Sequence, residues 1–128
     1  MKHVDFRAGK LKLLQIAPVT AFLGVQPGAS GAIGLVILID HSSSRNVEEM
    51  EYFLTLFHEL ISETGAVVGV THVDEAPEKP FDIYYEVLEQ RGMFLPVLPV
   101  DVREPDHVIL LLETLMTTLE YRSVLTYA

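Results

Sequence analysis

Hydrophobic and polar positions along the chain change between the spacing of strands and that of helices. Residues Ile33 to Asp40 (IGLVILID) are almost entirely apolar and branched, which is typical of a central strand covered on both faces. Ala66 to Thr71 (AVVGVT) repeats this pattern and predicts a second buried strand. Between them, residues 46–63 carry apolar side chains at helical spacing, and the predicted buried stripe is Met50, Phe53, Leu54, Phe57, Leu60 and Ile61.

The ends of this helix carry recognisable signals. Asn46, with Glu49 three residues later, resembles a capping box in which Asn46 is the cap. Gly65 is placed to end the helix.

The N-terminal third predicts a hairpin followed by a loop. His3 to Ala8 and Leu11 to Ile16 are strand-like, and the tight link at Gly9-Lys10 indicates antiparallel pairing. Residues 17–32 are rich in Pro, Gly and small side chains, so we expect a long loop there.

The C-terminal part predicts two helices and an edge strand. Pro80 opens a helix over residues 81–91. Residues 94–101 (FLPVLPVD) read as a strand at a sheet edge, because each of its two prolines removes a backbone donor. Pro105 begins the last helix, whose expected buried stripe is Val108, Leu111, Leu112, Leu115 and Leu119.

This order predicts an α/β fold. We expect a three-layer domain over residues 1–128, with a mostly parallel sheet of about five strands, an N-terminal antiparallel hairpin and three helices. A length of 128 residues, a hydrophobic fraction of 49% and a mean hydropathy of +0.31 suit a single domain with a core of its own.

The net charge limits the classes of partner. A formal charge of −9 and a pI of about 4.8 repel phosphate backbones and anionic lipids, so neither nucleic acid nor a membrane is an expected partner. The chain contains no cysteine, and no apolar run has the length of a signal peptide core or a membrane span. These features predict a cytoplasmic protein.

Three stretches resemble a known family. GAIGLVILID, VVGVTHVDEA and LPVLPVDVREPDHVILLLETLM are similar to the strands, guanine loop and last helix of prokaryotic small Ras-like GTPases of the gliding-motility type. The resemblance implies a truncated GTPase topology with P-loop-like connections, lacking the N-terminal strand, the phosphate loop and the first helix. It also implies that Thr71, His72 and Asp74 stand where the family reads guanine.

The chemical motifs of that family are degenerate here. No Gly-x-x-x-x-Gly-Lys-Ser/Thr loop is present, and the glycine-rich stretch GVQPGASGAIG lacks a lysine and precedes a strand. Residues Ala17 to Thr20 replace the family's Asp-x-x-Gly. The guanine loop keeps Asp74 but has His72 in place of lysine. We therefore expect a vestigial nucleotide site at Thr71, His72 and Asp74, with no catalytic residue, no cofactor and no metal.

The missing strand has a structural consequence. In the family, as the resemblance implies, the phosphate-loop strand separates the second hairpin strand from the strand ending at Asp40. Without it, these two strands either pair directly or leave an open slot, and an open sheet edge invites pairing with another chain. We therefore expect a homodimer.

Polar residues at strand ends are the remaining candidates. Asp40, Ser42 and Asp101 follow predicted parallel strands, at the edge where α/β sheets bind ligands. Glu75 lies near His72 and Asp74, where a two-ligand metal site is conceivable, but metal sites need three or four ligands at fixed spacing, so a polar loop is the preferred interpretation. Tyr85 is the aromatic residue of its helix expected to face a partner.

The leading hypothesis is a non-catalytic, GTPase-like regulatory or scaffolding domain that acts through protein–protein contact. The resemblance suggests a complete small GTPase or a roadblock-type regulator as partner. The alternatives are a small-ligand or guanine-nucleotide binder at the strand carboxyl ends, and a GTPase half completed in trans by another chain.

Overall fold

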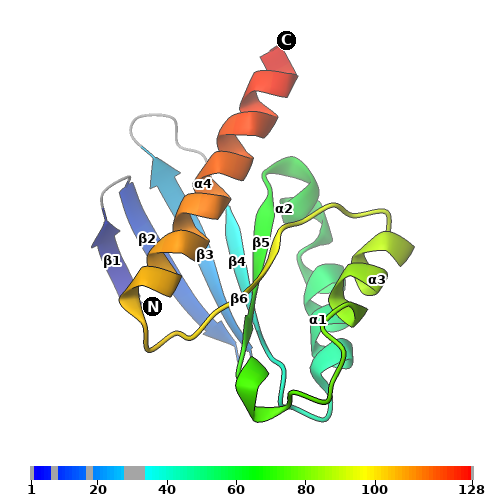
Figure 1. The fold of residues 1–128 in the computed structure, drawn as a ribbon. Helices are drawn as coiled ribbons and strands as arrows, with labels where there is room; N and C mark the ends of the chain where they lie inside the picture. The colour runs from blue at the N-terminus through cyan, green and yellow to red at the C-terminus, as the bar shows by residue number, and fades with distance from the viewer. Residues whose placement is uncertain (1, 7–8, 17–18, 28–33, 128) are drawn as a thin grey trace.

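The computed structural model describes residues 2–6, 9–16, 19–27 and 34–127, with side chains described from residue 34 to residue 118 (Figure 1). The strands are β1 (Lys2–Phe6), β2 (Gly9–Ile16), β3 (Val19–Pro27), β4 (Leu35–Asp40), β5 (Ala66–Thr71) and β6 (Val97–Pro99). The helices are α1 (Asn46–Leu56), α2 (His58–Glu63), α3 (Ile83–Gln90) and α4 (Pro105–Tyr127), with a short 3₁₀ turn, η1, at Val73–Glu75.

The described strands form one sheet in the order β1-β2-β3-β4-β5-β6. The fold is α/β as predicted, but its details differ from the expected five mostly parallel strands with a lone hairpin. Only β4, β5 and β6 are parallel, while β1, β2 and β3 form an antiparallel meander that joins β4. The described residues contain four α-helices rather than three, because the helix expected over residues 46–63 is split at Phe57.

The expected long loop contains β3, which is the largest correction to the sequence analysis. Residues Val19–Pro27 pair with β2 on one side and with β4 on the other. Their alternating Val, Ala, Leu and Val residues suit a strand, but the flanking glycines and prolines suggested a loop instead. As a result, β3 fills the place where an open slot was expected, and the structural reason for expecting a homodimer falls away.

The helices cover the two faces of the parallel part, as predicted. Both crossovers step in the same direction along the sheet, so right-handed connections place α1, α2 and α3 on one face. Their side chains pack with the alternate residues Leu35, Ile37 and Ile39 of β4. Figure 1 shows α4 on the opposite face, where Leu111, Leu112, Leu115 and Met116 pack against Val36 and Val67.

Gly69 in β5 lets α4 come close to the sheet. A Cβ at this position would lie 2.8 Å from Leu38 Cδ2, 3.1 Å from Leu111 Cδ2 and 3.2 Å from Val100 Cγ2. All three distances are shorter than ordinary carbon contacts, so a side chain here would push the helix outward.

The buried stripes agree with the prediction where side chains are described. Met50, Phe53, Leu54 and Ile61 are buried, and Phe57 packs at the edge of the core. The expected Leu119 contact of α4 lies outside the described side chains. The predicted cap is wrong, because helix α1 begins at Asn46 itself and no side chain caps it.

Candidate functional site

Parallel strands end at a common edge of the sheet, and three of the candidate site residues from the sequence lie at or just beyond it. Asp40 ends β4, Thr71 ends β5, and Asp101 follows β6 by two residues. Asp40 pairs with Thr71 in the β4–β5 register, which brings the first two side by side.

Asp40 and Ser42 form a compact polar turn. The Ser42 backbone N–H and hydroxyl both donate to Asp40 Oδ1, at 2.9 and 2.6 Å. Burial raises the pKa of Asp40, but these hydrogen bonds and the nearby charges of His72 and Lys79 outweigh it, so the net pKa is lowered. Asp40 therefore stays ionised and organises its own loop.

His72 has a left-handed backbone conformation, with φ 58° and ψ 31°, which non-glycine residues seldom adopt. Its Nδ1 lies 2.9 Å from Thr71 Oγ1 and 3.3 Å from Asp40 Oδ1. The Thr71 hydroxyl donates to the carbonyl of Ile39 at 3.3 Å, so it accepts from the ring. The structure thus brings Asp40 and Ser42, expected at the ligand edge, together with Thr71 and His72 of the expected nucleotide loop, but their polar groups mostly bond one another.

A buried polar network anchors the loops below this edge. His41 is 1% exposed, its Nε2 donates to the Lys79 carbonyl at 3.3 Å, and its Nδ1 accepts from the Tyr84 hydroxyl. Asn46 Nδ2 donates to the same hydroxyl at 2.9 Å. Lys79 Nζ in turn donates to the Ser43 carbonyl at 2.6 Å. These contacts join the end of β4, the start of α1 and α3, so His41 is structural rather than ligand-facing.

Asp74 and Asp101 line a small hollow. It is bounded by Thr71, His72, Asp74 and Glu75 on one side and by the residues from Val100 to Arg103 on the other. Its volume is about 130 Å³, below the 300–1,000 Å³ of ordinary ligand pockets. Asp74 is exposed. The hydrogen bond to Asp101 is the main cause that raises the pKa of Arg103, and the charges of Asp74 and Glu75 across the hollow add to it.

Asp101 is occupied by its own loop. Arg103 donates to it through its backbone N–H, Nε and Nη2, at 3.0, 3.0 and 2.8 Å. These hydrogen bonds lower the pKa of Asp101 to about 2. Its backbone N–H also donates to the ring of His107 at 3.0 Å, which ties the loop to the start of α4.

The strand order explains why the edge is shallow. Ligand crevices in α/β sheets open where the strand order reverses, whereas β4, β5 and β6 follow one another without reversal. The neighbour on the other side, β3, runs antiparallel to β4, so its carboxyl end lies at the opposite edge. Among the described side chains, no three histidine or acidic residues are placed to hold a metal ion.

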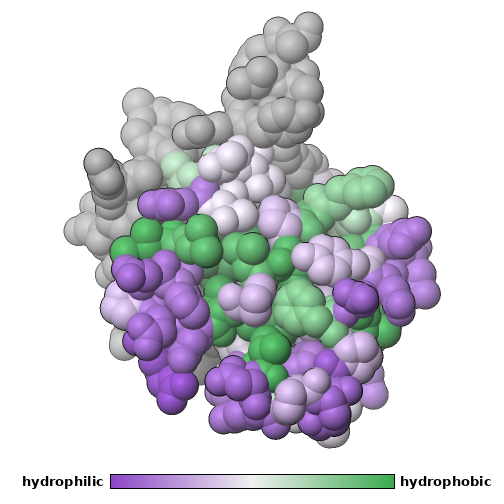
Figure 2. Space-filling view, in the orientation of Figure 1, coloured by the Kyte–Doolittle hydropathy of each residue, from purple (hydrophilic) through white to green (hydrophobic). Residues whose placement is uncertain are grey.

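A second and larger concavity, here called the apolar groove, lies between α3, the connection to β6, and α4. Its volume is about 790 Å³, and its lining residues are Tyr85, Leu88, Glu89, Met93, Phe94, Leu95, Pro96, Thr117 and Thr118. Figure 2 shows hydrophobic residues gathered at the middle of this face, with hydrophilic residues to either side. The area suits contact with an apolar partner.

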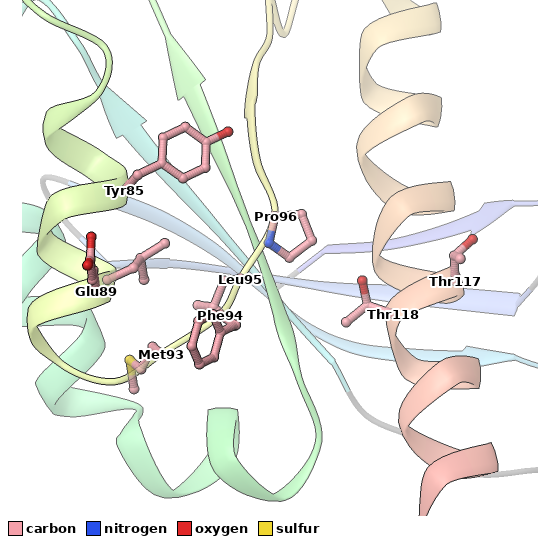
Figure 3. Close-up of a pocket in the computed structure, with 9 residues that line it drawn as sticks. Tyr85, Glu89, Met93, Phe94, Leu95, Pro96, Thr117 and Thr118 are labelled. Carbon is pink, nitrogen blue, oxygen red and sulfur yellow. The ribbon is translucent and has the colours of Figure 1, made fainter.

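Phe94 and Tyr85 stand on the surface of the groove. Phe94 is 93% exposed and Tyr85 is 47% exposed, although both side chains are aromatic. In the close-up of Figure 3, Tyr85 extends from α3 toward Pro96, and Thr117 and Thr118 lie across from it on α4. Tyr84 and Leu88 of the same helix are buried, while Tyr85 is exposed and free to meet a partner, as its place on the helix predicted.

Sequence reasoning missed Phe94 and the groove. Phe94 was assigned to the last strand, but β6 begins only at Val97. A large aromatic residue just ahead of a proline-bounded edge strand is the one signal in the sequence that marks it.

No family model, curated protein or solved structure matches this chain. Within the part of the chain that is described, no helix is both long and apolar enough to cross a bilayer.

Proposed function

We propose that this chain is a non-catalytic, GTPase-like regulatory or scaffolding domain that acts by binding another protein at the apolar groove. The exposure of Phe94 supports this best. Burying a Phe side chain against a partner contributes about 1.5–3 kcal/mol, and a lone aromatic beside an apolar hollow is typical of an interface anchor.

The shallow carboxyl edge supports the same proposal. Asp40 and Asp101 are engaged in hydrogen bonds of their own loops and Thr71 donates to the carbonyl of Ile39 in β4, so a ligand would have to displace these contacts. A partner that binds the apolar groove at Phe94 would not have to displace such hydrogen bonds, because this side chain carries no polar group.

The resemblance to gliding-motility GTPases suggests the class of partner. A complete small GTPase or a roadblock-type regulator in the cytoplasm fits a regulatory role, and a second copy of the chain is the remaining candidate. Completion of a GTPase in trans is disfavoured, because β3 already pairs with the strand edge that a complementing strand would use.

The proposal is tested by cross-linking from the groove. Because the chain has no cysteine, Thr117→Cys gives a unique attachment point for a photoreactive group on the exposed rim of the groove and leaves the Phe94 anchor in place. Tyr52→Cys is the matched control, since Tyr52 on α1 is 58% exposed and does not line the groove. We expect a defined protein adduct from position 117 and not from position 52, and the purified adduct partner should bind the unlabelled chain. Equal labelling from both positions would contradict the proposal.

Small-ligand or guanine-nucleotide binding at the carboxyl edge is the second candidate. The left-handed backbone of His72 beside the hollow favours it, since such conformations gather at binding sites. Calorimetry with GTP and GDP, with and without Mg²⁺, distinguishes the two. Micromolar binding that Asp74→Ala abolishes, and that Phe94→Ala leaves intact, would favour this candidate over protein contact.

A further inference from the structure

We propose that the occupant of the apolar groove is an amphipathic helix of a partner protein, with lysine or arginine beside its apolar stripe. This inference rests on the proposed function and narrows it to one kind of partner. Three features of the groove carry it: a closed strand edge, satisfied polar atoms and acidic surroundings.

The outer edge of β6 is closed to an added strand. Pro96 and Val100 bond β5 through the Pro96 carbonyl and the Val100 N–H, so Val97 and Pro99 turn their backbone groups outward. Pro99 has no N–H, and the Val97 carbonyl accepts from the Tyr85 hydroxyl at 3.1 Å. On this edge an added strand could accept from one free N–H group, that of Val97, and could not form a regular ladder of hydrogen bonds. A partner must therefore dock through side chains rather than by strand addition.

The walls of the groove suit a helix. Two helices, α3 and α4, flank it, and its floor is the chain from Met93 to Pro96 (Figure 3). A volume of about 790 Å³ is larger than one aromatic ring needs and leaves room for several side chains of a helical stripe. A helix laid between the two would present residues at i, i+3, i+4 and i+7 to Tyr85, Phe94 and the threonines of α4.

A partner that docks in the groove would leave few polar atoms without a hydrogen bond. The Thr118 hydroxyl donates to the Thr114 carbonyl at 2.9 Å, and the Tyr85 hydroxyl is bonded to Val97. The hydroxyl groups of Thr118 and Tyr85 are thus already paired, and Thr117, which is exposed at the rim, can keep its contact with water. Covering these groups costs little desolvation, because their hydrogen bonds persist in the complex.

The negative charge around the groove indicates which residues the partner's helix should carry. Glu89 lines the groove, Glu86 is exposed one turn earlier on α3, and the whole chain carries −9. The one basic residue near the end of α3, Arg91, donates to the Thr55 hydroxyl at 3.0 Å. Such a surface attracts a basic helix and repels a second copy of this acidic chain, so the basic partner is favoured over self-association.

The probes are three synthetic peptides of equal length. The first has leucines at helical spacing with lysine elsewhere, the second replaces each lysine with glutamate, and the third alternates valine and lysine as a strand. Fluorescence polarisation measures their affinities for the full chain. We expect the basic helix to bind, and its affinity to fall as salt is raised.

Matched variants place the binding in the groove. Phe94→Ala should weaken the basic helix by about 10- to 150-fold, as loss of one buried Phe implies. Glu89→Gln should weaken it about two- to fivefold, as for an exposed ion pair. Tyr52→Ala should change nothing, because Tyr52 lies outside the groove.

Several results would overturn the inference. These are equal binding of the acidic helix, tighter binding of the strand peptide, indifference to Phe94→Ala, or a dimer in sedimentation that Phe94→Ala dissolves. If position 117 cross-links a protein while no helical peptide binds, the proposed function stands and this narrower inference fails. If position 117 cross-links nothing, the function itself fails.

Discussion

Tyr84→Phe removes one hydroxyl from the buried network that joins the β4 loop to α1 and α3. Tyr84 is fully buried, and the substitution leaves packing volume almost unchanged. It deprives His41 Nδ1 of its donor and Asn46 Nδ2 of its acceptor. An orphaned buried polar group costs about 1–3 kcal/mol. Since Asn46 is 9% exposed and can be partly rehydrated, we expect a total loss of about 2–4 kcal/mol.

Urea unfolding followed by circular dichroism measures this loss. Tyr85→Phe is the control, because the neighbouring tyrosine is 47% exposed and makes a single hydrogen bond to Val97. We expect the control to cost under about 1 kcal/mol. In thermal unfolding, the Tyr84 variant should melt roughly 10–20 °C lower. If Tyr84→Phe lowers the free energy of unfolding no more than Tyr85→Phe does, the buried network does not stabilise the loops.

The same hydroxyl gives the network a signature at alkaline pH. Burial raises the pKa of Tyr84, a hydrogen bond from Asn46 opposes this, and the charge of Asp40 raises it further, with a net increase above the ordinary value of 10.0. Since the folded state holds this proton more tightly, the stabilisation is complete below pH 10 and is lost as the pH rises through the folded pKa. Urea titrations between pH 9 and 11 should show this loss in the native chain, and Tyr84→Phe should reduce it.

Further predictions concern the sheet and its carboxyl edge. Gly69→Ala should destabilise the fold by about 1–2 kcal/mol in urea unfolding, because the new Cβ would lie 2.8 Å from the Leu38 side chain. Alanine also reduces the conformational entropy of the unfolded chain, but this gain offsets only part of the strain. An unchanged urea midpoint would mean that α4 is free to move. Asp40→Asn should flatten the acid side of the stability curve, since the lowered pKa of Asp40 stabilises the fold above pH 3.8 and this contribution is lost as the pH falls. The carboxyl carbon of Asp101 should titrate by NMR near pH 2 and shift toward 3.8 in Arg103→Gln, and a native midpoint near 3.8 would refute the bidentate pair.

The sequence predicts the parallel half well because its signals are local and agree with the packing. The apolar run ending at Asp40 and the one ending at Thr71 are both buried strands, and the helical stripe at Met50 and Phe53 is buried as expected. The two prolines around β6 placed it correctly at the sheet edge. In these segments, the spacing of apolar side chains predicts the same buried positions that the tertiary packing produces.

The meander was only partly predicted because its signals compete. Residues Val19–Pro27 carry strand-forming side chains, but neighbouring glycines and prolines suggested a loop. Pairing with both β2 and β4 decides the outcome, and such pairing is not visible in a local window.

The candidate site was predicted by position but not by function. Asp40, Thr71 and His72 do meet at the carboxyl edge, yet their mutual hydrogen bonds depend on a turn that the sequence does not specify. The role of Asn46 was misjudged because its amide bonds a tyrosine 38 residues away rather than its own helix. Phe94 escaped notice because exposure depends on where the short strand β6 begins.

The sequential order of the strands has a kinetic consequence. Every described strand bonds only to the strands immediately before and after it in the chain. The antiparallel pairs of β1, β2 and β3 close short loops, whereas the parallel pairs, such as Leu35 with Ala66 and Val68 with Val97, close over a whole helical crossover. The entropic cost of loop closure is therefore lower for the meander, which we expect to form before the parallel half. During synthesis, each new strand leaving the ribosome meets a finished edge on which to pair, and the sheet grows in one direction from β1 to β6.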